Sequence, residues 1–320
     1  MKPATNDPGT PELPSTRAIR RATRIVLGLL IVLMVSFAGY YVSDRYFHPE
    51  QPAPGELHLE HLENAVHDEP QDPQLRVALA ESYLREGLDV EALEQAGQVL
   101  RQYPDNASAL FVAGVSQVRL DRPQAALASL HRFVALRKDG AMARSDTALE
   151  AAYYYLGESY VKLGRPAEAI PLLEAALLIT PVDADALYQL GLALEANGQP
   201  ELAVQRYGEA VRLVPDFVEA YHGMAGAYAV LDRPDHGTYA RGMVAFCQKD
   251  YQAAVALLER ATQALPGFGP AFLGLGLSYE GMGSLQPALP AIRRALELDP
   301  GDYAAQQALG RLQAATEAQN

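Results

Sequence analysis

Cysteine is almost missing from this chain, which has a single one, Cys247, in 320 residues. An intrachain disulfide, a Cys-x-x-Cys redox pair, a haem attachment motif and a cysteine-ligated zinc site are therefore excluded. We interpret Cys247 as a small packing residue of a helix. A reactive thiol or an intermolecular disulfide is the alternative.

The sequence also lacks the patterns that carry catalysis. No glycine-rich phosphate loop follows a strand pattern, and no Ser-His-Asp order at useful spacing stands out. His58, His61 and His67 are close together, but Glu60 and Glu63 beside them indicate a solvated helix face rather than a metal site. We therefore expect no enzyme activity, no cofactor and no small-molecule substrate.

Basic residues are scarce outside the N-terminal region. The net charge is −13, and residues 1–43 contribute +3 to it because they hold five basic and two acidic side chains, so residues 44–320 carry −16. Phosphate backbones need clustered Lys and Arg. The acidic body therefore argues against a nucleic-acid partner.

One long uncharged run is present. The nineteen residues 25–43 have no charged side chain and would span about 28 Å as a helix, close to the thickness of a bilayer core. Arginines cluster before the run and mostly acidic residues follow it, which predicts a cytosolic N-terminus. We expect a cytosolic disordered basic tail over 1–24, a single transmembrane helix over 25–43 and a Pro-rich spacer over 44–56. A signal peptide cleaved after Ala38 is the alternative.

A period of 34 residues runs through the rest of the chain. Small residues, each expected where two helices touch, recur at this spacing with one interval of 43 and one of 17. They are Ala80, Gly114, Gly157, Gly191, Ala225, Gly242, Gly276 and Gly310. A second small residue follows most of them after twelve positions, and prolines punctuate the ends of the units. Two helices in each 34-residue unit are typical of a helical solenoid.

The pattern resembles the tetratricopeptide repeat (TPR) over roughly residues 57–318. Leu156-Gly157 and Leu190-Gly191 match its Leu-Gly pair, and its aromatic position is occupied by Tyr83, Tyr160, Tyr228 and Tyr279. The resemblance implies an all-α TPR solenoid of about six to seven helix-pair repeats, preceded here by the transmembrane helix.

The two irregular intervals predict two local departures. The first is an insertion over 139–149, either a helix extension or a surface loop. The second leaves one helix, 235–248, to act both as the second helix of one repeat and as the first helix of the next. We expect a change of curvature there, dividing the solenoid into 57–231 and 232–317, the latter closed by a capping helix from Tyr303.

The resemblance also implies a binding site for a protein partner on the concave side, which the first helices of the repeats line. Residues at the lining positions form the predicted partner-binding groove: Phe111, Val115, Tyr154, Glu158, Lys162, Tyr188, Leu192, His222, Tyr239, Met243 and Phe246. The Lys and Asn set with which chaperone-binding members clamp a terminal carboxylate is missing, so that specificity is not expected.

Together these features resemble bacterial periplasmic TPR assembly and scaffold factors. We expect a single-pass protein of the cell inner membrane whose TPR domain is periplasmic, anchored in the lipid bilayer through 25–43. It would hold a protein partner during assembly of a membrane or envelope complex, of which cytochrome c maturation is one case, or serve as an accessory subunit of such a complex. The alternatives are a cytosolic-facing adaptor that regulates an envelope enzyme and a periplasmic small-ligand receptor.

Overall fold

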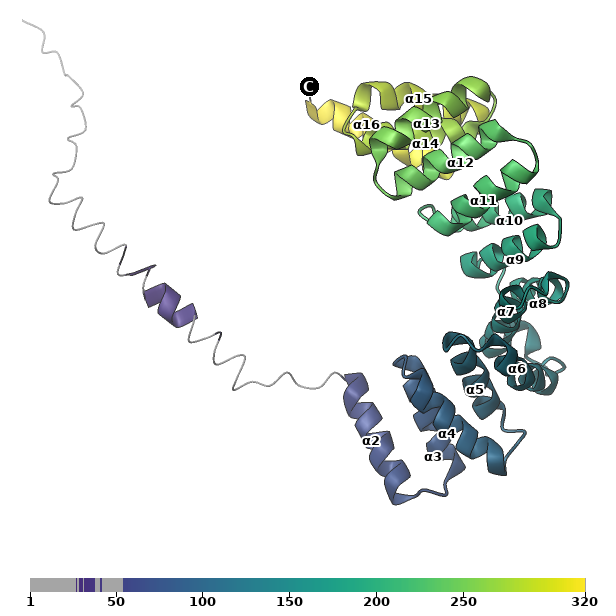
Figure 1. Ribbon diagram of the computed structural model, residues 1–320. Helices are drawn as coiled ribbons and strands as arrows, with labels where there is room; N and C mark the ends of the chain where they lie inside the picture. The colour runs from purple at the N-terminus through teal and green to yellow at the C-terminus, as the bar shows by residue number, and fades with distance from the viewer. Residues whose placement is uncertain (1–26, 28, 31, 38–40, 42–53, 320) are drawn as a thin grey trace, which may run out of the picture. The chain divides into compact units, whose positions relative to one another are not determined.

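The computed structural model describes residues 27, 29–30, 32–37, 41 and 54–319 (Figure 1). The predicted basic tail 1–24, most of the predicted spacer and several residues of the predicted span 25–43 lie outside the described residues. Those of the span that are described are helical. None of the helices within the described residues combines the length and apolarity that crossing a bilayer requires.

The chain divides into two compact units, Met1–His61 and Leu62–Asn320, and the second holds the repeats. Every regular element described in that unit is helical. In chain order the helices are α2 (Pro54–Asp68), α3 (Pro73–Arg85), α4 (Asp89–Gln102), α5 (Ala107–Arg119), α6 (Pro123–Arg137), the 3₁₀ helix η1 (Ala143–Ser145), α7 (Thr147–Lys162), α8 (Pro166–Ile179), α9 (Ala184–Ala196), α10 (Pro200–Leu213), α11 (Val218–Val230), α12 (Pro234–Cys247), α13 (Tyr251–Ala264), α14 (Gly269–Gly281), α15 (Leu285–Leu298) and α16 (Tyr303–Gln319).

Local signals set where these helices begin. The side chains of Asp72, Asn106, Asp146 and Asp183 accept hydrogen bonds from backbone N–H groups of the first turns of α3, α5, α7 and α9. These bonds satisfy donors that a helix start leaves without a partner. Prolines occupy the first position of α3, α6, α8, α10 and α12, where no N–H is needed.

The turn inside each helix pair reverses the chain through one left-handed residue. Glycine serves at Gly87, Gly164, Gly198 and Gly283, with φ between 67° and 76°. Asp121, Asp232 and Lys249 adopt the same conformation with φ of 56°, 53° and 62°. A side chain at such a φ costs free energy that glycine does not, so three of the turns carry backbone strain.

Neighbouring helices pack in sequence order, each on the next, from α3 to α16. The first helices of successive repeats also contact one another: α3 with α5, α5 with α7, α7 with α9 and α9 with α11, then α12 with α14 and α14 with α16. Second helices make no comparable contacts among themselves within the described residues. The first helices therefore form a continuous row, as the sequence predicts.

Small residues make this close packing possible. A methyl group added at Gly114 would lie 2.5 Å from Leu130 Cγ, and one at Gly242 would lie 2.7 Å from Leu258 Cγ. The corresponding position in the last helix, Gly310, meets nothing within 4 Å and is exposed. The prediction that Gly310 lies at a helix contact is wrong, because no second helix follows α16 in the described chain.

The predicted insertion is a turn with the short helix η1, followed by an early start of α7 at Thr147. Its ends are joined by an ion pair of 2.6 Å between Arg137 Nε and Asp146 Oδ2. Asp146 also caps α7. The inserted residues therefore form a closed loop, and α6 still packs on α7.

Helix α12 has the double role that the 17-residue interval predicts. It packs on α11 as a second helix and on α13 and α14 as a first helix. Gly237 and Gly242, the small residues of the two roles, are both buried. The division of the solenoid into 57–231 and 232–317 stays a prediction.

Candidate partner-binding face

The predicted groove residues divide into two groups in the structure. Side chains of the first group are half-buried or exposed on α5, α7, α9, α11 and α12: Phe111, Tyr154, Glu158, Lys162, Tyr188, Leu192, His222 and Phe246. We call the part of this set on α7, α9 and α11 (residues 154, 158, 162, 188, 192 and 222) the first-helix face. Within the described residues, no further helix packs across this row of first helices.

Three predicted groove residues belong to the core instead. Val115, Tyr239 and Met243 are 1%, 5% and 5% exposed. Tyr239 packs against Tyr221 of α11, with ring centroids 6.4 Å apart, and against Phe268 at 5.0 Å. Both sides of α12 are covered because the helix serves two repeats, so Tyr239 and Met243 have no surface left for a partner.

Tyr188 is the centre of an aromatic cluster. Its ring centroid lies 5.9 Å from that of Tyr207 on α10 and 5.1 Å from that of Phe217, which precedes α11. Burial raises the pKa of Tyr188 above its ordinary value, and the carboxylates of Glu219 and Glu195 raise it further. The ring therefore lies among carboxylates at the contact of α9 with α11.

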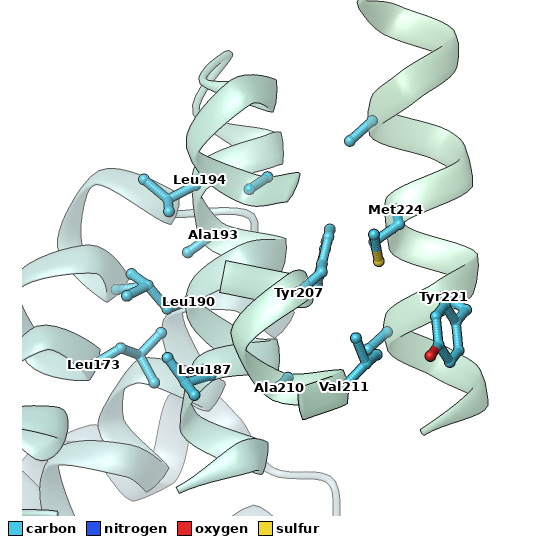
Figure 2. Close-up of a cluster of buried hydrophobic side chains, with 14 of the residues drawn as sticks. Leu173, Leu187, Leu190, Ala193, Leu194, Tyr207, Ala210, Val211, Tyr221 and Met224 are labelled. Carbon is cyan, nitrogen blue, oxygen red and sulfur yellow. The ribbon is translucent and has the colours of Figure 1, made fainter. Parts of the chain in front are cut away.

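Tyr207 is the residue that the sequence interpretation missed. It is fully buried on α10, at the position where the other second helices carry Leu130, Leu173, Leu258 or Ile292. Figure 2 shows its side chain between α9 and α11. The Tyr207 hydroxyl donates to Glu195 Oε2 over 2.9 Å and so fixes the direction of that carboxylate. The signal that could have identified Tyr207 is its register position, which is the one occupied by the large buried residue of the other second helices.

A similar arrangement occurs one repeat earlier. Burial raises the pKa of Tyr154 on α7, and the carboxylates of Glu158 and Asp185 raise it further. Lys162 Nζ lies 3.1 Å from Glu158 Oε1 and 3.6 Å from Asp121 Oδ1. Lys162 is therefore engaged in ion pairs within the chain.

The start of α7 holds a carboxyl group whose pKa is raised. Burial, and after it the neighbouring Asp183, raise the pKa of Glu150 to about 7. Burial also raises the pKa of Asp185, and Asp183 adds to the shift. Among the described residues no group of three His, Cys, Asp or Glu side chains has a geometry that could hold a metal ion. The arrangement is that of a polar and aromatic surface.

The thiol of Cys247 is half-buried, and its Sγ lies 3.8 Å from the Pro215 carbonyl oxygen. Burial, followed by Asp216, raises its pKa to about 11. Nucleophilic attack requires the thiolate. Packing on the segment before α11 is therefore the role that the structure supports.

A pocket of about 120 Å³ lies between α3 and α4 and is lined by Pro70, Arg76 and Tyr103 among others. Arg76 there donates to the Pro70 carbonyl and to Gln95 Oε1, so its guanidinium is bound within the chain. Sites for small molecules usually enclose about 300–1,000 Å³. The pocket gives no support to the small-ligand alternative.

Family comparisons agree with the architecture. A family model described as tetratricopeptide repeat matches overlapping windows from residue 59 to residue 235, namely 59–107, 90–141, 111–184, 154–217 and 188–235. A second model with the same description matches residues 270–302. Together they span most of the described solenoid.

A curated protein, the peroxisomal targeting signal receptor of Eremothecium gossypii, is 28% identical over 168 residues. The match includes 51% of this chain but only 27% of the receptor, so the chain spans about a quarter of that relative.

Among solved structures, YrrB, titled as a TPR protein with an unusual peptide-binding site, has a TM-score of 0.50 and 20% identity over 62% of this chain and 97% of its own. MamA from Desulfovibrio magneticus RS-1 (41-end) has a TM-score of 0.48 and 24% identity, over 56% of this chain and 96% of its own. At 20% identity the likeness to YrrB concerns the fold alone.

Proposed function

The chain belongs to the tetratricopeptide repeat family, and we propose that it holds a protein partner on its first-helix face while anchored to a membrane. Proteins of this fold act as interaction scaffolds and are typically non-catalytic. The single observation that carries the proposal is the row of first helices, across which no described helix packs. Tyr154 and Tyr188 recur on it at one register position in successive repeats.

The composition of this face fits protein recognition. Aromatic residues are enriched at the centres of interfaces, and truncating a central one commonly costs about 2 kcal/mol or more of binding free energy. Tyr188 is half-buried by Tyr207 and Phe217, so its ring is already ordered before a partner arrives. Less conformational entropy is then lost on binding.

The membrane location is part of the proposal and rests on sequence. The uncharged run 25–43, with arginines before it, supports an anchor with the N-terminus in the cytosol and the solenoid in the periplasm. Assembly of an envelope complex, cytochrome c maturation among them, or a permanent place in such a complex are the roles that this location suits. Alkaline phosphatase fused after Asn320 should then be active in cells. Activity of a cytosolic reporter fused at the same point would contradict the proposed orientation.

Binding at the first-helix face is tested by adding a larger side chain there without disturbing the core. Gly226 on α11 is exposed, and a methyl group added there would meet only Glu195 Oε1, at 3.2 Å. Gly226→Gln should therefore fold normally and obstruct the face. Gly208→Gln is the matched control, because Gly208 lies on the second helix α10 with nothing within 4 Å of an added methyl.

The readout is crosslinked capture of the partner from membranes of the native cells, quantified by mass spectrometry. We expect Gly226→Gln to reduce capture at least about fivefold and Gly208→Gln to leave it unchanged. Equal capture by both folded variants, at the level of the natural chain, would place recognition elsewhere than on this face.

A further inference from the structure

Acidic residues are concentrated on one stretch of the row of first helices. Helices α7, α9 and α11 carry five carboxylates and one lysine, which gives a net charge of −4 with His222 neutral. The other described first helices α3, α5, α12, α14 and α16 sum to +1. The acidity of the whole chain therefore does not explain this stretch, because the remaining first helices do not share it.

Two of these carboxylates lie beside the aromatic cluster. Glu195 Oε2 accepts the Tyr207 hydroxyl, which leaves Oε1 directed toward Gly226 of α11. Glu219 follows two residues after Phe217, whose ring centroid is 5.1 Å from that of Tyr188. The two carboxylates thus come from adjacent repeats, and both act on Tyr188, whose pKa they raise in addition to burial.

Helix α11 leaves space next to them. Gly226 and Ala229 give it two exposed positions with little or no side chain, between the exposed His222 and Val230. A methyl group at Gly223 would lie 2.7 Å from Tyr207 Cε2, so the Tyr207 ring lies directly under the bare backbone. A long side chain from a partner could lie along α11 here and reach Glu195.

We propose that the surface formed by Tyr188, Glu195, Glu219 and the glycines of α11 binds an extended segment of the partner that carries Lys or Arg side chains. The inference rests on the proposed function and adds the chemistry of the partner. A cation gains from the face of a tyrosine ring and from charge-assisted bonds to carboxylates. The fixed carboxylate of Glu195 and the ring cluster supply both. Tyr154 with Asp185 repeats part of the pattern one unit earlier, where Glu158 is already paired with Lys162 of its own helix.

The test measures binding of defined peptides to the full-length chain. Two end-blocked, fluorescein-labelled ten-residue peptides share a background of Ala and Ser, and one carries three Lys where the other carries three Glu. Fluorescence anisotropy gives both affinities for the natural chain, for Glu195→Gln with Glu219→Gln, and for a control with Glu174→Gln and Glu201→Gln. The control removes the same charge from exposed positions on the second helices α8 and α10.

We expect the Lys peptide to bind at least about tenfold more tightly than the Glu peptide, and the first-helix double variant to lose about tenfold in that affinity. The control should change it by less than about twofold. Circular dichroism and thermal melting establish that both variants are folded. Equal binding of the two peptides, or equal loss in the control, overturns the inference.

The two proposals fail separately. Suppose that Gly226→Gln abolishes capture of the native partner, while the Glu195→Gln, Glu219→Gln variant captures it fully and the Lys peptide does not bind. The first-helix face then remains the binding site, and the basic character of its partner is refuted.

Discussion

Replacing Gly191 by alanine tests the packing that holds two repeats together. Gly191 on α9 and Gly223 on α11 both lie against the Tyr207 ring. A methyl group at Gly191 would lie 2.6 Å from Tyr207 Cδ1 and 2.9 Å from Cζ, which is closer than real contacts allow. The ring has little freedom to withdraw, because Gly223 meets it from a different helix and its hydroxyl is bound to Glu195.

The magnitude follows from two opposing effects. Alanine gains about 1 kcal/mol over glycine in a helix interior. Overpacking costs about 1–3 kcal/mol, and a confined ring indicates the upper end of that range. Gly191→Ala should therefore lower the free energy of unfolding by about 2 kcal/mol, and the melting temperature by about 4–8 °C.

Thermal melting followed by circular dichroism measures this, with Gly208→Ala as the control. Gly208 is in a helix interior with no atom within 4 Å of an added methyl, so its substitution should raise the melting temperature by about 2–4 °C. In a Tyr207→Ala background the ring is gone, and Gly191→Ala should become neutral or stabilising. Equal effects of Gly191→Ala with and without the ring would show that the Tyr207 ring does not cause the loss of stability.

Two further predictions concern the backbone and pH. Lys249→Gly should stabilise the chain by up to about 1 kcal/mol in urea unfolding, because Lys249 has a φ of 62° in its turn; a loss of stability would contradict the strain assigned there. Glu150 has its pKa raised from 4.5 to about 7 by burial and by Asp183. Its contribution is fully present below pH about 4.5 and lost as the pH rises through about 7. The melting temperature of the natural chain should therefore fall more between pH 5 and pH 8 than that of Glu150→Gln, and parallel curves would contradict this.

The repeat architecture could be predicted because its signals are local and periodic. Small residues, turn residues and helix-starting prolines recur every 34 positions, and each of them has a direct steric reason. The double role of α12 was predicted for the same reason. An interval of 17 residues leaves room for one helix, which must be the second helix of one repeat and the first helix of the next. Gly310 fits the period, yet no described atom lies within 4 Å of a methyl group added there. The pattern gives the position of a contact residue but not the helix that would face it.

The repeat pattern does not determine which of the expected groove residues are exposed. Phe111, Tyr188 and Tyr239 share one register position, yet Tyr239 is buried where the other two remain partly accessible. The difference arises from contacts of α12 with α11 and α14, which are tertiary. The role of Tyr207 was missed for a related reason: the pattern gives its position, but its hydrogen bond to Glu195 depends on how far its ring extends between α9 and α11.

Site-specific photocrosslinking tests the central claim, that the first-helix face binds the partner, most directly. A photoreactive phenylalanine analogue would replace one exposed residue at a time in native cells: Asp185 or His222 on first helices, and Leu178 or Leu202 on second helices. We expect the same partner adduct from positions 185 and 222 and none from 178 and 202. Adducts from the second-helix positions alone would contradict this claim and move recognition to the opposite side of the solenoid.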